Sequence, residues 1–170
     1  ETARITVQAA LTGHLVLTTL HTNSAASAVM RLVDMGIEPF LIAATLRCSV
    51  GQRLVRMLCR TCRTKTRVVP PFPDTILRAA GLEPGAEVEC WVGAGCEHCG
   101  HTGYYGRMAL FEVMPLTEDL RGHLLRGAAV SALHSEAVRQ GMLPLIADGV
   151  LRALAGQTSF EEVLRVVQDG

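Results

Sequence analysis

Two Cys-x-x-Cys pairs constrain this chain more than any other feature of its sequence. The first pair is Cys59 and Cys62, and the second is Cys96 and Cys99. Two residues between paired cysteines allow a tight turn to direct both sulfurs at one point, so two such turns supply a tetrahedron of thiolates. Structural zinc sites use this ligand set, with Zn–S bonds of about 2.3 Å and no position open for a substrate. We therefore predict a structural Zn²⁺ site held by these four cysteines.

The two remaining cysteines leave alternatives open. Six cysteines also permit three disulfides in a secreted protein, but 170 residues are enough to bury a core without them. Four of the six sulfurs lie in paired turns, which favours a metal in a reducing compartment. Cys48 lies in an apolar stretch that we expect to be helical, and there it would be a packed thiol. Cys90 precedes Cys96 by six residues and stays open as a competing ligand, as does His98.

The composition is that of a globular chain without net charge. Apolar residues make up 49% and charged residues 19% of the sequence, which is typical of a packed domain. Sixteen basic residues balance sixteen acidic ones, so there is no general attraction to nucleic acid or to an anionic membrane. No apolar run is long enough to span a bilayer. The chain begins at Glu1 without a methionine, and we expect it to be a fragment of a longer protein.

Hydrophobic periodicity predicts an α/β fold. The run from His14 to Leu20 is apolar almost throughout, as expected of a strand buried on both faces of a sheet. Such a strand places His21 at its carboxyl end, the edge where open α/β sheets bind ligands. The other predicted strands are Gln52–Leu58, Glu87–Val92 and Arg107–Met114. The predicted helices are Thr2–Leu11, Ala25–Met35, Pro39 to about Val50, Thr75–Ala80, Thr117–Arg126, Ser131–Gln140, Pro144–Leu154 and Phe160–Val167.

These patterns divide the chain into three consecutive parts. Residues 1–58 form an α/β core, residues 59–113 form a tetracysteine zinc-binding module, and residues 114–170 form a helical C-terminal subdomain. The last helix opens with the capping-box pattern Ser159-Phe-Glu-Glu162.

Outside the cysteines, the residues alone carry only weak signals of chemistry. His21 is able to contact a phosphate at the predicted strand end, although a core histidine satisfied by one hydrogen bond is the simpler interpretation. The signal from His14, at the other end of that strand, is weaker still. No Gly-Lys pair of the phosphate-binding loop is present. A basic cluster surrounds the first cysteine pair, and its simplest role is a solvated flank: Arg53, Arg56, Arg60, Arg63, Lys65 and Arg67.

Several stretches, taken in order, resemble one family. Residues 10–23, Ala-Leu-Thr-Gly-His-Leu-Val-Leu-Thr-Thr-Leu-His-Thr-Asn, resemble the histidine box of the bacterial secretion ATPases. These are the hexameric motors of type II secretion and type IV pilus assembly, of the GspE/PulE and PilB types. The resemblance covers nearly the whole chain and continues through residues 31–39, 52–56, both cysteine pairs, 103–107, 148–149 and 156–163.

The resemblance implies a particular place for this sequence in a motor. The chain would be the C-terminal portion of a RecA-like core, beginning just after Walker B, followed by the four-cysteine zinc module and the helical subdomain. His21, and more weakly His14, would contribute to the γ-phosphate end of a site for ATP and Mg²⁺. Arg53 would lie near the bound nucleotide.

The resemblance also implies partners and a location. The family's motors are cytoplasmic homohexamers, peripheral on the inner membrane, in which ATP hydrolysis drives the secretion or pilus platform proteins. Retraction motors of the same superfamily lack the cysteine quartet, so the quartet indicates the secretion or pilus-extension branch. Type II secretion, type IV pilus and competence systems share these motifs. Because Walker A and Walker B are absent, we expect the fragment alone to be inactive as an ATPase.

Two other functional classes remain possible from the sequence. One is a stand-alone structural zinc-ribbon module that contacts protein or nucleic acid, which the basic cluster supports. The balanced charge and the scattered aromatic residues oppose a nucleic-acid partner, and we expect none. The other is a regulatory or assembly fragment without activity of its own.

Overall fold

The computed structural model describes residues 2–168, with side-chain burial through Val166. The chain divides into two compact units, each built from an early and a late stretch of sequence. Unit 1 comprises Glu1–Gly51 and Glu112–Met142, and unit 2 comprises Gln52–Phe111 and Leu143–Gly170. The three consecutive parts suggested by the sequence stay a prediction. No helix within residues 2–168 combines the length and the apolar character that a membrane crossing requires.

Unit 1 consists mainly of helices. Neighbouring helices pack in pairs, α1 with α3, α3 with α5, α5 with α6 and α2 with α6. Their bounds are α1 Thr2–Leu11, α2 Ala25–Asp34, α3 Pro39–Thr45, α5 Glu118–Leu125 and α6 Val130–Arg139. The shared core includes Ala25, Ala26, Val29, Ile42, Met114, Leu120, Leu124 and Leu133.

Local capping signals explain where two helices of unit 1, α2 and α5, begin. Before α2, the Ser24 hydroxyl accepts a hydrogen bond from the N–H of Ser27 at 3.1 Å, and the Ser27 hydroxyl accepts one from the N–H of Ser24 at 2.9 Å. These two bonds satisfy backbone donors that the first helical turn leaves free. Thr117 caps α5 through a single bond, in which its hydroxyl accepts the N–H of Leu120. The predicted helices at these places are confirmed.

The helix predicted from Pro39 to about Val50 is wrong beyond Thr45. Helix α3 ends at Thr45, and strand β1, Cys48–Leu58, begins three residues later. β1 pairs with β4, Tyr104–Pro115. The N–H of Leu116 donates to the carbonyl of Arg47 at 2.9 Å, so pairing with a distant segment overrides the local helical pattern. Cys48 is exposed on this strand and is not the packed thiol that the sequence suggested.

The strand predicted over His14–Leu20 is also wrong. The chain is irregular from His14 to Thr22, and the side chains of Leu15 and Leu17 are 87% and 89% exposed. A strand forms only where a neighbour accepts and donates its backbone hydrogen bonds. Within residues 2–168 the sheets contain only the pairs β1–β4 and β2–β3, so this apolar run has no strand beside it.

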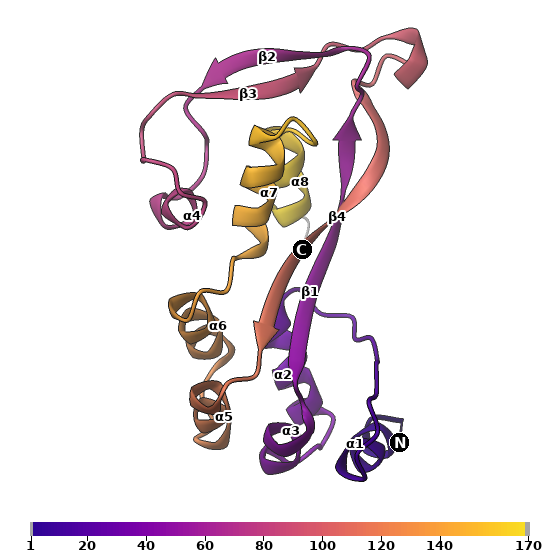
Figure 1. The fold of residues 1–170 in the computed structure, drawn as a ribbon, viewed down its shortest axis with the longest axis vertical. Coiled ribbons are helices and arrows are strands. Elements are labelled where there is room, and N and C mark those ends of the chain that lie inside the picture. Colours follow the sequence, from indigo (N-terminus) through magenta and orange to yellow (C-terminus); the bar gives the residue numbers. More distant parts are fainter. Residues whose placement is uncertain (1, 169–170) are drawn as a thin grey trace. The chain divides into compact units, whose positions relative to one another are not determined.

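In unit 2 a second β pair, β2 and β3, lies beside the helices α7 and α8. Figure 1 shows β2 and β3 lying across one end of α7 and α8. β2 and β3 are antiparallel, with Lys65 opposite Trp91 and Thr66 opposite Cys90. Besides most of β1 and β4, the unit contains β2 Arg63–Val68, α4 Asp74–Ala79, β3 Val88–Gly93, the 3₁₀ turn η1 Glu97–Cys99, α7 Leu145–Leu154 and α8 Phe160–Gln168. Its core includes Phe72, Leu77, Cys90, Ala147, Val150, Ala153, Phe160 and Val163.

A close contact with α8 and a buried acid hold helix α7 in place. A Cβ added at Gly149 would lie 2.6 Å from Val163 of α8, so only glycine allows the two helices to approach this closely. The carboxylate of the preceding Asp148 accepts the N–H of Phe111 at 3.0 Å and pairs with Arg152 at 3.2 Å.

The chain as a whole contains both helices and strands, so the predicted α/β class is confirmed.

Candidate metal centre

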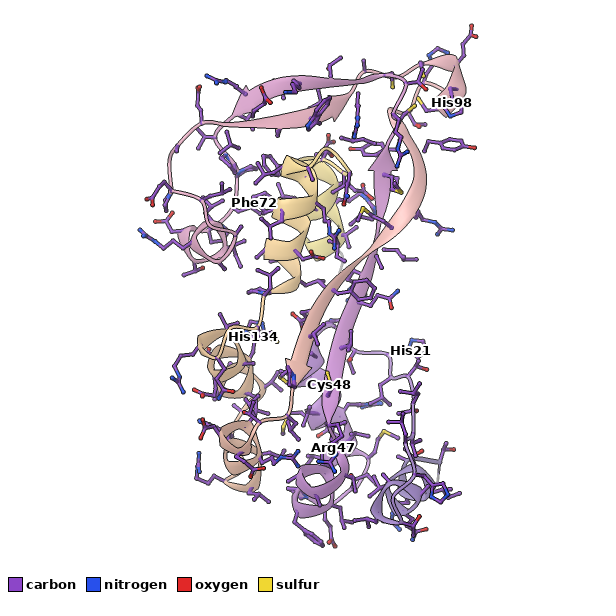
Figure 2. All side chains as sticks on the ribbon, in the orientation of Figure 1. His21, Arg47, Cys48, Phe72, His98 and His134 are labelled. Atoms are coloured by element: carbon purple, nitrogen blue, oxygen red, sulfur yellow. The ribbon has the colours of Figure 1, made fainter. Side chains whose placement is uncertain are left out.

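The four predicted cysteine ligands converge in unit 2. Figure 2 shows sulfur atoms gathered beside His98, next to the ends of β1 and β4. The ligand atoms of Cys59, Cys62, Cys96 and Cys99 all lie within 4.8 Å of one another. Three Sγ–Sγ separations are 3.9 Å, 3.9 Å and 3.8 Å. A tetrahedron with Zn–S bonds of about 2.3 Å has edges of about 3.8 Å, so the sulfur positions fit a tetrahedral metal ion.

The first cysteine pair sits in the turn between β1 and β2. Cys59 directly follows β1, and the carbonyl of Cys59 accepts the N–H groups of Cys62 at 3.3 Å and Arg63 at 3.0 Å. The carbonyl of Cys62 accepts the N–H of Ala94 at 3.1 Å. Hydrogen bonds within the turn therefore fix its shape, and one further bond connects it to Ala94, which precedes the second pair.

The second pair sits in the turn around η1. The N–H of Cys96 donates to Cys99 Sγ at 3.2 Å, and the N–H of His101 donates to the carbonyl of Cys96 at 2.9 Å. Gly100 and His101 both have a positive φ, 58° and 61°. Non-glycine residues adopt this conformation uncommonly, and its presence beside a set of ligands is consistent with a turn shaped for a specific purpose.

Gly103 joins the two turns. The carbonyl of Gly103 accepts the N–H of Cys59 at 2.9 Å, and the N–H of Gly103 donates to Cys99 Sγ at 3.3 Å. A Cβ added at Gly93 would lie 2.3 Å from the Gly103 carbonyl oxygen. The absence of a side chain at Gly93 therefore lets the two cysteine turns meet.

The sulfurs differ in their readiness to ionise. Burial raises the pKa of the Cys99 thiol. Hydrogen bonds from the backbone N–H groups of Cys96 and Gly103 and from neighbouring cysteines outweigh burial and lower this pKa to about 6. Burial raises the pKa of Cys62 to about 12, against a backbone hydrogen bond from Gly95. The lowered pKa of Cys99 favours the thiolate, the form in which cysteine binds a metal.

The two alternative ligands lie outside the quartet. Cys90 is 3% exposed and packs in the apolar core of unit 2, where burial raises the pKa of its thiol. His98 is exposed, and its ring lies 4.5 Å from the ring of Tyr105. Within residues 2–168, the residues grouped for metal binding are the four cysteines alone.

The residues predicted to contact a nucleotide lie on two different segments, an irregular one and strand β1. His14 and His21 belong to the irregular segment of unit 1, and both are exposed; Figure 2 labels His21 on this segment. His14 Nδ1 lies 3.0 Å from the Thr12 hydroxyl. Arg53 is half-buried on β1 in unit 2. Their roles toward a nucleotide stay predictions.

The sequence interpretation did not predict that Glu162 and Glu112 are buried, as Asp148 is. Glu162 is fully buried, and its carboxylate accepts hydrogen bonds from the backbone and guanidinium of Arg56 and from Arg165. Burial raises the pKa of Glu162, but the bonds from Arg165 and Arg56 outweigh it and lower this pKa to about 2. Glu112 is 3% exposed and accepts the N–H of Ala25 at the start of α2.

Signals for both acids were present in the sequence. The capping-box pattern identified Ser159, whose hydroxyl accepts the N–H of Glu162 at 3.2 Å, but it did not reveal the long-range partners of the carboxylate. Glu112 alternates with Leu110 and Met114 on the buried face of β4. A charged residue on an apolar strand face indicates a buried partner.

Comparison with known proteins gives matches over almost the entire chain. The family model described as "Type II/IV secretion system protein" matches residues 1–165. The chain is 46% identical over 167 residues to the type IV pilus assembly ATPase PilB of Thermus thermophilus, covering 96% of this chain and 18% of that protein. It is 43% identical over 169 residues to the type II secretion system protein E of Aeromonas hydrophila, covering 99% of this chain and 33% of that protein.

A solved structure with the same fold is the ATPase DotB of Legionella pneumophila. Its TM-score to this chain is 0.62 at 22% sequence identity, with 99% of this chain and 36% of DotB covered. This likeness supports the predicted RecA-like portion at the level of fold. The chain spans about a fifth to a third of the length of the curated relatives.

Proposed function

Because the chain belongs to the type II/IV secretion system protein family, we propose that it is the C-terminal part of a motor ATPase that powers type II secretion or type IV pilus assembly. The observation that carries this proposal is the tetrahedral cysteine cluster inside a match that extends over residues 1–165. The cluster favours the secretion and pilus-extension branch, because retraction motors lack it. ATP hydrolysis and force generation would belong to the longer protein.

The role we propose for the cysteine cluster is a structural Zn²⁺ site. Four sulfur donors at tetrahedral separations suit zinc and leave no position for a substrate. Bound zinc would stabilise the turns that join β1 to β2 and β3 to β4. Metal analysis of the chain purified under reducing conditions is expected to give one zinc per chain, and a Cys62→Ser, Cys99→Ser double variant is expected to give none. Zinc-free wild-type protein would contradict this role.

The role we propose for His21, and more weakly His14, is contact with the γ-phosphate end of a bound ATP with its Mg²⁺. Arg53 would lie near the nucleotide. In a longer protein that contains this chain together with a phosphate-binding loop, His21→Ala is expected to lower kcat by about 100-fold, as when one donor to the transition state is lost. His123→Ala on α5 is the matched control and is expected to leave kcat unchanged. Equal rates for the two variants would remove His21 from the mechanism.

The assembly we propose is a homohexamer on the cytoplasmic face of the inner membrane, in contact with the platform proteins of a secretion or pilus system. Light scattering of the longer protein with Mg²⁺ and a non-hydrolysable ATP analogue is expected to give six copies. A stable monomer under these conditions would argue against a motor. The 170-residue chain alone is expected to show background ATP turnover in a phosphate-release assay, because no Gly-Lys phosphate loop is present in it.

A further inference from the structure

We propose that the segment Gly156–Glu162, which we name the C-terminal clasp, positions the backbone that carries the four cysteines. In this way it determines how tightly they hold their metal. The proposal rests on the zinc role proposed above. The clasp joins α7 to α8 and opens α8. It contains no metal ligand, so its influence is one of positioning. Three sets of contacts connect it to residues adjacent to the ligands.

The first set fixes the strand that leads into Cys59. The N–H of Leu58 donates to the carbonyl of Gln157 at 2.9 Å. The hydroxyl of Thr158, a fully buried residue, donates to the carbonyl of Arg56 at 2.8 Å. Leu58 is the residue immediately before the first ligand, so these two bonds determine where β1 delivers Cys59.

The second set runs through Glu162 and Tyr104. The buried Glu162 carboxylate accepts the Arg56 N–H at 2.9 Å and the Arg56 guanidinium at 2.6 Å. The guanidinium carbon of Arg56 lies 4.1 Å from the centre of the Tyr104 ring, and the Tyr104 hydroxyl shares a 2.6 Å hydrogen bond with Ser159. Tyr104 follows Gly103, the residue that bonds to both Cys59 and Cys99. The clasp therefore also holds the junction of the two cysteine turns.

The third set holds the residue after Cys62. The guanidinium of Arg63 donates to the carbonyl of Gly156 at 2.5 Å and lies 4.7 Å from the centre of the Trp91 ring. A Cβ added at Gly156 would approach the Trp91 ring to 2.7 Å, and the φ of Gly156 is +70°. Both facts favour glycine at this position, because glycine adopts a positive φ without strain and leaves room for the Trp91 ring.

These contacts act on the metal through the backbone that carries the ligands. Partners outside the ligand set orient the ligands, and losing one typically costs 10–100-fold in metal affinity. Loss of a clasp contact leaves all four sulfurs in place but frees Leu58, Arg63 or Gly103 to move. The expected result is faster release of the metal from an unchanged ligand set.

The test is zinc release from the zinc-loaded 170-residue chain to a chromogenic chelator. Thr158→Val and Tyr104→Phe each remove one clasp hydrogen bond, and Glu162→Gln removes the charge that accepts several. Each variant is expected to accelerate release by about tenfold. Glu161→Gln is the matched control for Glu162→Gln, because Glu161 is exposed beside it, and is expected to release zinc at the wild-type rate. Thr158→Val and Tyr104→Phe conserve shape, so the test survives if Glu162→Gln fails to fold.

A second control separates positioning from general stability. Leu77 is 2% exposed on α4 in the core of unit 2, and it makes none of the three sets of clasp contacts described above. Leu77→Ala is expected to lower the thermal stability of unit 2 while Zn²⁺ release at 25 °C stays near the wild-type rate. Substitution with Co²⁺ is expected to give the sulfur-to-metal charge-transfer band of four thiolates in wild type and clasp variants alike.

The outcomes distinguish the clasp from the metal site itself. Clasp variants that release zinc at the wild-type rate, or no faster than a Leu77→Ala chain of equal stability, overturn the clasp proposal alone. A wild-type chain that binds no zinc overturns the proposed metal centre and the clasp with it. A weakened charge-transfer band in the clasp variants means that a ligand was lost, which also contradicts a positioning role.

Discussion

At the scale of single residues, Glu162 makes stability depend on pH. Hydrogen bonds from Arg165 and Arg56 outweigh burial and hold the pKa of Glu162 at about 2 in the folded chain, below its usual 4.5. A carboxyl whose pKa is lowered by folding stabilises the fold at pH values above its unfolded pKa. This contribution is lost as the pH falls from about 4.5 towards about 2. The buried carboxylate thus predicts an acid-sensitive unit 2.

We expect the difference in unfolding free energy between wild type and Glu162→Gln to shrink as the pH falls. At neutral pH the variant should be less stable by on the order of 1–3 kcal/mol, because it loses a charged acceptor of several hydrogen bonds. Chemical denaturation of both proteins at about pH 6 and about pH 3, with zinc treated identically, measures this difference. A difference that stays constant over this interval would contradict the assignment of the titration to Glu162.

Gly93 is expected to be intolerant of even one added carbon. A Cβ there would lie 2.3 Å from the Gly103 carbonyl oxygen, a backbone atom that bonds to Cys59. Gly93→Ala should therefore destabilise the fold by about 2 kcal/mol or more and lower zinc retention. Gly122→Ala on α5 is the contrasting variant, since the nearest added contact is the flexible side chain of Arg126. It is expected to be neutral or stabilising in the same thermal melt.

At the scale of elements, local signals were sufficient for most helices. Ser24 and Thr117 cap helices that begin where the sequence predicted, and Pro39 opens α3 as expected. The cysteine quartet was predictable for the same reason, because Cys-x-x-Cys spacing describes a local turn. The clasp was not predictable. Thr158 and Glu162 meet Arg56, which lies about one hundred residues earlier, and no local pattern encodes such a pair.

Strands were harder because a strand depends on its neighbour. The alternating Arg-Thr-Lys-Thr-Arg of β2 has no apolar face, so its pairing with β3 was missed. The apolar run His14–Leu20 has the composition of a buried strand but has no strand beside it within residues 2–168. Composition therefore indicates the propensity for a strand, whereas the presence of a partner decides whether it forms.

The irregular segment from His14 to Thr22 is expected to exchange its amide hydrogens rapidly in the 170-residue chain. Its backbone lacks a sheet ladder, and Leu15 and Leu17 are exposed. Amides of α2, which begins with a capping box, should exchange far more slowly. Hydrogen exchange read by mass spectrometry compares the two segments in one experiment. Protection in residues 14–22 equal to that in α2 would contradict the irregular assignment.

At the scale of the whole molecule, removal of the metal should affect the two units differently. All four cysteines and the clasp belong to unit 2, whereas unit 1 has its own apolar core and no proposed ligand. Metal binding contributes directly to the folding free energy of a zinc module. Chelation should therefore increase hydrogen exchange in β2, β3 and the cysteine turns, and leave α2, α5 and α6 near their original protection. Uniform loosening of both units would contradict this division.

The sequence order of the cysteines and the clasp has a consequence during protein synthesis. Cys99 is made roughly 60 residues before Glu162, an interval of several seconds at about 5–20 residues per second. During that interval the nascent chain offers four thiols without the segment that immobilises their neighbours. A wrongly acquired ion has this time to exchange, and the interval ends when α8 is translated and folds. If the proposed zinc site and clasp are correct, the order of translation would allow the metal to be selected before the clasp closes on it.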